Sequence, residues 1–564
     1  MRGDRLLTAE AQNALLVYPK FNAASFWNYG ETCEMVGAKY PASPLGLITV
    51  AAMLPKSWNV RLVDRNVEEL EDADLDWADM VMTGGMLPQQ RDCLMLIERA
   101  QARGKAVVVG GPDVTSSPEI YAIADIRVLG EAESVIEEFL AAWAAGTRRG
   151  DFVAPKFQAD VTASPVPRFD LLKLDRYLHV GVQFSRGCPF TCEFCDIIEL
   201  YGRRPRMKTT PQMLAELDAL YALGYRGHVD FVDDNLIGNK KAVKAFLPHL
   251  ADWQKKNRHP FELSTEASLN LAEDRELMEL MRGAGFFSVF VGIESPDPEV
   301  LAATSKKQNT RGDISESVHK IYGSGMFVLA GFIVGFDSEK GRVSAPINDL
   351  IEDAAIPVAM VGMLYALPNT QLTRRLAKEG RLHPDHGVDM DDGSADQCLS
   401  GLNFDTLRPR AEILADYRAV VDAVYSPKNY FGRVRRVGQA LKIQMSAGDI
   451  NPGAAWKDCV QVVRLMTAIT LRKPQFRGEF WKTIVLTALR NPLALKAVLQ
   501  MSALYAHLGP FSRHVVSAIG EKIEAVESGA WTAPTALPGT APAAAHAPAA
   551  HVPAHAQAAA VSAA

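Results

Sequence analysis

The sequence is poor in net positive charge, in cysteine and in long apolar runs, and each shortage excludes a class of protein. Its 60 lysine and arginine residues are outnumbered by 66 aspartate and glutamate residues, which gives a formal net charge of −6. Nucleic acid is therefore excluded as a dominant partner, because phosphate binding needs a clustered basic surface. Seven cysteines among 564 residues are too few and too scattered for a disulfide framework. No uncharged apolar stretch reaches the roughly 20 residues that span a bilayer.

The first residues also lack the apolar core and small-residue cleavage site of a secretory signal, so we expect a cytoplasmic protein. Hydrophobic residues make up 48% of the chain and charged residues 22%, as in ordinary globular proteins. A chain of 564 residues exceeds what one hydrophobic core organises, so two to four domains are expected.

Short β-branched runs alternate with amphipathic stretches in the first quarter of the chain. This alternation is typical of βαβ units, and it predicts a Rossmann-like, doubly wound parallel sheet over residues 1–146. The expected strands are 14–19, 60–64, 78–85, 105–111 and 126–133, and the expected helices are 44–54, 94–103 and 134–143.

A second alternation predicts another α/β unit further along the chain. Residues 147–176 contain several prolines and little periodicity, so they are expected to be a linker. Six strand-like runs between 177 and 370 predict a partial (β/α)6 barrel of the TIM type. Residues 371–527 predict a helical C-terminal domain, and the Ala/Pro/His-rich residues 528–564 a disordered tail.

Three of the seven cysteines fall within eight residues, in the stretch SRGCPFTCEFCD. Cys188, Cys192 and Cys195 have the spacing C-x3-C-x2-C and follow a predicted strand. Three thiolates on one short loop can bind three irons of a [4Fe–4S] cluster and leave the fourth iron open for a ligand. A structural zinc site is the simpler alternative, but it requires a fourth ligand, and no second C-x2-C pair or nearby histidine supplies one.

This triplet, with Phe194 before its third cysteine, resembles the signature of the radical S-adenosylmethionine (SAM) superfamily over residues 180–370. The resemblance implies that an open iron chelates SAM and cleaves it to a 5′-deoxyadenosyl radical. It also implies SAM or substrate contacts from Phe194, from the strand ending at Gly335, and from Glu266 and Glu294. Residues 233–235 (Asp-Asp-Asn) replace the family's usual glycine-rich amino-group motif, so the group that binds the SAM ammonium stays open.

A parallel sheet that precedes a radical SAM unit resembles the cobalamin-dependent class of that superfamily, the class B methyltransferases. Open α/β sheets bind ligands at the carboxyl ends of their strands. No G-x-G-x-x-G follows the first strand, which counts against a dinucleotide site, although a flavodoxin-like domain remains the plainer alternative. The positions that the resemblance assigns to the corrin and its nucleotide tail are Thr83, Gly84, Gly110, Gly111, Gly130 and Glu131.

The chain has no histidine before His179. The N-terminal sheet therefore cannot supply the histidine that replaces the lower axial base in other cobalamin domains. The sequence predicts cobalamin in its base-off, His-off form.

Enzymes of this class use one SAM as methyl donor and another as the source of the radical that abstracts hydrogen from an unreactive carbon. Residues 27–55 and 366–376 resemble a bacterial subgroup with a helical C-terminal domain, the hopanoid C-2 methylases. The resemblance implies a lipid substrate and hopanoid biosynthesis. Two alternatives remain: a non-methylating cobalamin radical SAM enzyme, as in tetrapyrrole metabolism, and an iron–sulfur sensor without turnover.

This interpretation predicts two further partners, an electron donor and a membrane surface. A radical SAM enzyme needs an electron donor, for which a ferredoxin or flavodoxin is expected. The apolar stretch 480–511 carries interspersed lysines and arginines, which is typical of peripheral membrane contact as well as of an ordinary helical core with a basic face.

Overall fold

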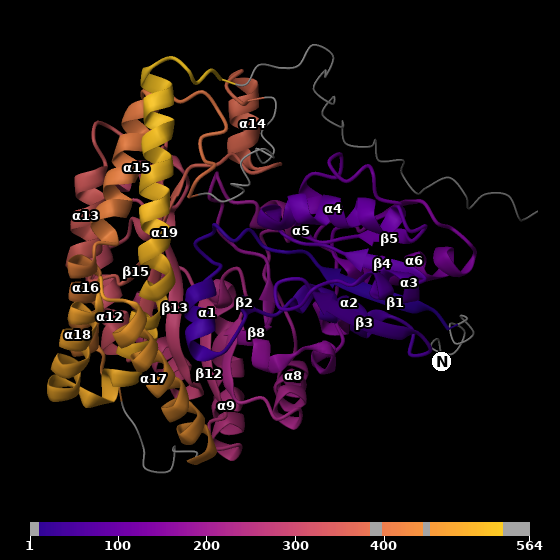
Figure 1. The fold of residues 1–564 in the computed structure, drawn as a ribbon, viewed down its shortest axis with the longest axis horizontal. Helices are drawn as coiled ribbons and strands as arrows, with labels where there is room; N and C mark the ends of the chain where they lie inside the picture. Colours follow the sequence, from indigo (N-terminus) through magenta and orange to yellow (C-terminus); the bar gives the residue numbers. More distant parts are fainter. Residues whose placement is uncertain (1–10, 384–397, 444–451, 534–564) are drawn as a thin grey trace, which may run out of the picture.

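The computed structural model describes residues 11–383, 398–443 and 452–533. It contains two parallel sheets and a group of long C-terminal helices (Figure 1). The expected tail lies largely outside the described residues. Within them, no helix is both long and apolar enough to cross a membrane.

The first sheet has six parallel strands and helices on both faces. Side chains alternate between the faces, so Leu15 and Val17 enter one core and Ala14 and Leu16 the other. The strands, in spatial order, are β3 (Asn59–Asp64), β1 (Asn13–Tyr18), β4 (Met80–Thr83), β5 (Ala106–Val109), β6 (Ile126–Leu129) and β7 (Gly150–Val153). The helices are α2 (Leu45–Met53), α3 (Asp72–Trp77), α4 (Gln90–Gln101), α5 (Pro112–Ser116) and α6 (Ile136–Ala144).

The second sheet forms the partial barrel. Its seven strands are parallel and lie in the order β15 (Val358–Met363), β14 (Phe327–Val334), β13 (Phe286–Glu294), β12 (Phe261–Glu266), β11 (Gly227–Phe231), β8 (Tyr177–Val182) and β2 (Tyr40–Ala42). Its helices are α8 (Thr210–Ala222), α9 (Lys240–Lys256), α10 (Arg275–Ala284), α11 (Pro298–Ala303), α12 (Ile314–Gly323) and α13 (Ser344–Asp353).

Two short strands differ from the sequence-based expectation. β7 lies in the range expected to be a linker, yet it pairs with β6 as the edge of the first sheet. β2 lies between β1 and β3 in the sequence, yet it pairs with β8 of the barrel. The chain therefore enters the barrel before it has completed the first sheet.

The remaining helices follow the barrel in the sequence, and all but the first of them lie along one side of it, in orange and yellow in Figure 1. They are α14 (Gln371–Lys378), α15 (Arg410–Val424), α16 (Pro427–Ala440), α17 (Pro452–Arg472), α18 (Arg477–Arg490) and α19 (Leu495–Glu527). The short helix α1 (Gly30–Val36) packs against α17 and α19. One continuous core joins this N-terminal segment, the barrel and the C-terminal helices, from Phe21 to Ile523.

Candidate functional site

The three clustered cysteines lie in the loop that follows β8 and the short strand β9 (Ser185–Arg186). Cys192 is buried, and Cys188 and Cys195 are partly buried. Gly187 precedes the first cysteine in a left-handed conformation (φ 96°), and a Cβ there would lie 2.8 Å from the carbonyl oxygen of Gly202. Only glycine fits this close approach, so the loop enters the cysteine turn in a fixed direction.

Hydrogen-bond donors face two of the sulfur atoms. The Asn235 Nδ2 donates to Cys188 Sγ at 3.8 Å, and the Gln308 Nε2 donates to Cys192 Sγ at 3.7 Å. Burial raises the pKa of the Cys188 thiol, which disfavours a free thiolate. Amide donors aimed at sulfur suit ligands that carry negative charge, because such bonds offset the cost of burying it.

The sulfurs do not converge on a single point. Among the residues that the structure describes, no three His, Cys, Asp or Glu side chains form a group that could hold one metal ion. A four-iron cluster does not need such a group, since each cysteine binds a different iron. The loop, its spacing and its donors thus fit a cluster.

Lys306 joins the cysteine loop to the end of β13. Its Nζ lies 2.7 Å from Glu294 Oε1, and both side chains are about nine-tenths buried. Burial lowers the pKa of Lys306, but the charges of Glu294, Cys192 and Cys195 outweigh it and raise that pKa above its ordinary value. Glu294 itself adopts a left-handed backbone conformation (φ 70°), which is rare for a non-glycine residue and occurs often at functional sites.

Asp233 and Asp234 hold the strand that leads to the cysteines. Asp233 accepts hydrogen bonds from the backbone nitrogen of Phe184 (2.9 Å) and from Ser185 Oγ (2.5 Å), and Asp234 accepts one from the backbone nitrogen of Gly187 (3.1 Å). Burial raises the pKa of Asp233 to about 7 and that of Asp234 to about 6. Because the two carboxyl groups bind the segment that precedes Cys188, their role in this structure is to hold that segment in place.

Glu266 is the last residue of β12. Part of its side chain reaches solvent, but protein atoms lie close around its carboxyl group. This crowding raises its pKa to about 8, and the carboxylates of Asp230, Asp234 and Asp233 add to the effect. A carboxyl group with a raised pKa at the carboxyl end of a barrel strand is typical of a binding or catalytic position.

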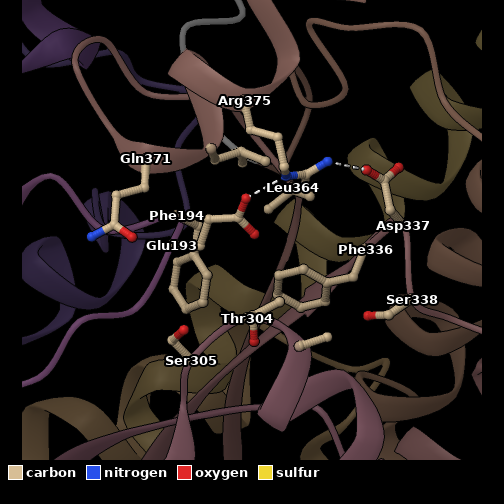
Figure 2. Close-up of a pocket in the computed structure, with 12 residues that line it drawn as sticks. Glu193, Phe194, Thr304, Ser305, Phe336, Asp337, Ser338, Leu364, Gln371 and Arg375 are labelled. Atoms are coloured by element: carbon tan, nitrogen blue, oxygen red, sulfur yellow. Dashed lines mark hydrogen bonds and ion pairs between the residues drawn. The ribbon is translucent and has the colours of Figure 1, made fainter. Parts of the chain in front are cut away.

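A cavity of about 450 Å³ opens beside the cysteine loop, and Figure 2 shows the residues that line it. The rings of Phe194 and Phe336 have centroids 5.6 Å apart and are tilted by 56°. Arg375 of α14 reaches across the cavity and contacts Glu193 on one side and Asp337 on the other, at 2.5 and 2.9 Å (Figure 2). The aromatic pair and the charged rim together suit a flat, polar ligand such as a nucleoside.

Gly335 follows β14 at the edge of this cavity. Its φ is 111°, and a Cβ there would lie 2.7 Å from Leu402 Cδ2. Glycine is thus required by the local backbone and packing, whichever ligand binds nearby.

The turns expected to meet cobalamin gather at the carboxyl edge of the first sheet. The backbone nitrogen of Gly110 donates to the Thr83 carbonyl at 3.0 Å, and that of Gly130 donates to Thr115 Oγ1 at 2.9 Å. A Cβ on Gly84 would lie 2.1 Å from the Gly110 carbonyl oxygen, so this glycine is needed for the packing of the two turns. Gly111 (φ 101°) leads into α5. The result is a glycine-rich edge with few side chains, which fits a flat macrocycle.

Glu131 has partners that the sequence did not indicate. Arg186, two residues before Cys188, lies 3.1 Å from Glu131 and 2.7 Å from Glu133, and Arg206 lies 2.8 Å from Glu131. All four side chains are largely buried. Burial alone would raise the pKa of Glu133, but Arg186 lowers it to about 2. We call Glu131, Glu133, Arg186 and Arg206 the interdomain ion-pair cluster, since it links the first sheet to the cysteine loop.

Family models match three consecutive parts of the chain. Residues 35–140 match the B12 binding domain, residues 182–342 the radical SAM superfamily, and residues 370–521 a domain of unknown function (DUF4070). An uncharacterized methyltransferase of Synechocystis sp. is 42% identical over 514 residues, which cover 90% of this chain and 94% of that protein. The chain belongs to the cobalamin-binding radical SAM family.

Other members of this family extend the comparison. The hopanoid C-2 methylase of Rhodopseudomonas palustris is 36% identical over 428 residues, covering 74% of this chain and 78% of that protein. The cobalamin-dependent SAM radical enzyme OxsB has the same fold, with a TM-score of 0.57 at 15% identity over 93% of this chain and 82% of its own. The radical SAM methyltransferase TsrM of Kitasatospora setae has a TM-score of 0.51 at 16% identity, covering 65% and 78%.

Membership of the cobalamin-binding radical SAM family confirms the expected fold class and identifies the chain as a methyltransferase. The cofactors of the family are a [4Fe–4S] cluster, SAM and cobalamin. Sequence reasoning missed Lys306, Gln308, Arg186 and Arg375, because each meets its partner only after distant segments come together. Their residue types alone carried no signal.

Proposed function

We propose that the protein methylates an unactivated carbon of a hopanoid lipid, at C-2 of its A ring. The observation that carries this proposal is the 36% identity to a hopanoid C-2 methylase over 74% of the chain. One feature of the fold supports an apolar substrate. Trp27, in the segment between β1 and α1, keeps 36% of its surface exposed and lies with its ring centroid 5.5 Å from that of Phe290 on β13. Two aromatic rings at this place offer an apolar wall to a fused-ring hydrocarbon.

In this proposal Cys188, Cys192 and Cys195 hold the cluster, and Asn235, Gln308 and Lys306 stabilise the charge on their sulfurs. Cluster, SAM and cobalamin together supply a hydrogen-abstracting radical and a transferable methyl group. Each turnover consumes two SAM and two electrons, replaces a substrate C–H bond by C–CH3, and releases S-adenosylhomocysteine, 5′-deoxyadenosine and methionine. A ferredoxin or flavodoxin supplies the electrons.

The cavity lined by Phe194 and Phe336 is the proposed place for the adenosine part of SAM. Lys306 and Glu294, at the end of β13, are placed to meet its methionine part or the substrate, as is Glu266 on β12. The reaction moves the substrate hydrogen onto the deoxyadenosyl carbon, so no side chain needs to transfer a proton. Lys306, Glu294 and Glu266 are therefore assigned to binding and orientation.

The carboxyl edge formed by Thr83, Gly84, Gly110, Gly111 and Gly130 is the proposed face for cobalamin. Glu131, engaged with Arg186 and Arg206, is assigned to positioning this edge. No histidine precedes His179, so the cofactor is expected base-off and His-off. The electron paramagnetic resonance spectrum of its Co(II) form should then lack nitrogen superhyperfine splitting, and splitting would contradict this assignment.

The test is anaerobic. The full chain is reconstituted with iron, sulfide and cobalamin and given SAM, reductant and a hopanoid, and its products are quantified by mass spectrometry. Formation of 5′-deoxyadenosine, S-adenosylhomocysteine and a 2-methylhopanoid supports the proposal. If 5′-deoxyadenosine and S-adenosylhomocysteine form without a methylated hopanoid, the enzyme methylates a different substrate. If only 5′-deoxyadenosine forms, the non-methylating alternative replaces the proposed methyltransferase.

The matched controls are two cysteine variants. Cys192→Ala should reduce 5′-deoxyadenosine to background. Cys459→Ala removes an exposed cysteine of α17 and should leave the product ratio unchanged. Equal SAM cleavage by both variants would contradict the cluster assignment.

A further inference from the structure

Exposed apolar side chains recur along α17 and α18. On α18 the side chains of Trp481, Val485 and Leu489 are spaced four residues apart, which places them on one helical face. They are 37%, 51% and 76% exposed, and Leu471 at the end of α17 is 74% exposed. The Trp481 Nε1 donates to Thr470 Oγ1 at 3.0 Å, so the two helices meet where their exposed apolar side chains begin.

The series continues at both ends. Val463 lies two turns before Leu471 and is 57% exposed, and Leu493 after α18 is 46% exposed. Isolated exposed leucines are common on protein surfaces, but six large exposed apolar side chains within 31 residues, on two consecutive helices and the turn that follows, are typical of a binding surface. We call Val463, Leu471, Trp481, Val485, Leu489 and Leu493 the α17–α18 stripe.

Positive charge surrounds the stripe, although the whole chain is acidic. Residues 459–500 contain seven lysines and arginines and a single acidic residue, Glu479, which gives a local net charge of +6 against −6 for the chain. Glu479 is itself paired with Arg435 at 2.7 Å. Arg472, Arg477 and Arg490 are exposed and form no ion pair within the described part of the chain. Their charge is thus available to an anionic partner.

The stripe lies away from the cysteine loop. Lys496, at the start of α19, pairs with Glu262 at 2.8 Å, and Gln500 of the same helix donates to the same carboxylate at 3.1 Å. Glu262 is at the amino end of β12, whereas the cysteines follow the carboxyl end of β8. In Figure 1, α17 and α18 lie at the bottom of the helical layer and α14, which contacts the cysteine loop through Arg375, lies at its top.

These observations select one occupant. A second copy of the chain, related by a twofold axis, would bring the exposed Arg472, Arg477 and Arg490 towards the same three arginines, which is repulsive. An electron donor would bind near the cluster, but the stripe is at the opposite end of the barrel. An anionic lipid surface satisfies both features at once, because apolar side chains enter the acyl boundary while the flanking cations contact phosphate groups.

We propose that the α17–α18 stripe and the basic residues around it dock the protein on an anionic lipid bilayer. The surface lies within residues 370–521, so the proposal gives the C-terminal helical region a function of its own. Docking of this kind is peripheral, since no described helix can span the bilayer. The proposal does not depend on which carbon the enzyme methylates.

The test is sedimentation of the full-length protein with lipid vesicles. We expect binding to vesicles of phosphatidylcholine mixed with phosphatidylglycerol, and at most weak binding to phosphatidylcholine alone. Val485→Ser with Leu489→Ser removes two exposed apolar side chains that would enter the bilayer, and it should weaken binding on the order of tenfold or more. Arg477→Glu with Arg490→Glu should also weaken it, and high salt should weaken the wild type. Leu407→Ser, another leucine that is 67% exposed, is the matched control and should bind normally.

Each other outcome overturns the proposal. No binding to anionic vesicles, or equal binding by the stripe variant and the wild type, removes the stripe as a lipid surface. A dimer in light scattering that the serine variant dissociates would assign the stripe to contact between copies. Formation of 5′-deoxyadenosine by the variants shows that they are folded, and it separates a failure of docking from a failure of the proposed reaction.

Discussion

Lys306 is the residue through which the end of β13 and the cysteine loop influence each other. Replacing it with alanine leaves the Glu294 carboxylate buried without its partner, which should cost about 3 kcal/mol of unfolding free energy. Denaturation of the apoprotein by urea measures this cost. Lys307→Ala, at the exposed neighbouring position, is the control and should change stability by less than about 0.5 kcal/mol.

A double-mutant cycle distinguishes a pair from two independent residues. Lys306→Ala combined with Glu294→Gln should recover most of the lost stability, because the neutral amide no longer needs a cation. Additive losses would show that the two side chains do not interact.

Glu266 should make stability depend on pH. Its pKa is about 8 in the folded protein, above the ordinary value of 4.5. Well below pH 4.5 the residue is protonated in both states. As pH rises towards 8 only the unfolded state releases the proton, so stability falls, and above 8 the full penalty is present. Glu266→Gln should therefore be more stable than the wild type at pH 9, by about 1 kcal/mol after allowance for its exposed face.

The same comparison at pH 3 is the control, since there Glu266 is neutral in the folded and the unfolded state. An equal difference at the two pH values would mean that packing, not ionisation, separates them.

At this scale the sequence was informative where chemistry is local. The cysteine spacing lies within eight residues, so the cluster loop could be predicted without a fold. The pairing of Lys306 with Glu294 could not, because it depends on how the loop after α11 returns to the end of β13. The strained φ of Glu294 likewise follows from tertiary packing, for which one residue type gives no signal.

Among the elements, the interdomain ion-pair cluster connects the carboxyl edge of the first sheet to β9. Replacing Arg186 with alanine leaves Glu131 with Arg206 alone and Glu133 without a cation, which should destabilise the apoprotein by about 3 kcal/mol. The replacement should also lower methylated product more than 5′-deoxyadenosine, because it alters the placement of one cofactor relative to the other. The ratio of the two products measures this effect.

Arg127→Ala is the control for Arg186→Ala. Arg127 pairs with Asp151 at 2.6 Å between β6 and β7, on a more exposed surface, so its loss should cost less than about 1 kcal/mol. The product ratio should not change. A parallel fall of both products in Arg186→Ala would show that the cluster is structural only.

The long elements were predictable and the short ones were not. Buried parallel strands such as β1 and β14 are nearly continuous apolar runs, and such runs can be recognised in the sequence. β7 has four residues of which only Phe152 is buried, and β2 has three residues including Pro41, so neither shows a strand pattern. Both are edge strands, where proline and polar residues are tolerated.

In the whole molecule, the C-terminal helices complete the barrel. Tyr425 donates its hydroxyl to the Ala359 carbonyl at 2.7 Å, and Arg433, fully buried, donates to the Ile356 carbonyl at 2.7 Å. A chain ending at residue 409 would expose this side of β15 and leave polar groups without partners. We expect it to be insoluble, whereas a chain ending at 533 should unfold like the full-length protein. Circular dichroism during thermal unfolding measures both.

A soluble, cooperatively unfolding product that ends at 409 would show that the barrel is independent of these helices. Composition and periodicity led us to expect several domains. They could not predict the shared core from Phe21 to Ile523, because this core depends on contacts between the two ends of the chain.

The contact between these ends has a consequence for biosynthesis. Thr32 donates its hydroxyl to the carbonyl of Ala503, a partner 471 residues further along the chain. At typical elongation rates, the ribosome needs roughly half a minute to a minute and a half to make that partner. Throughout this interval Phe26 and Tyr29 lack their ring partners Phe511 and His507, and they are available to chaperones or to other nascent chains. The segment that is synthesised first is therefore among the last to mature.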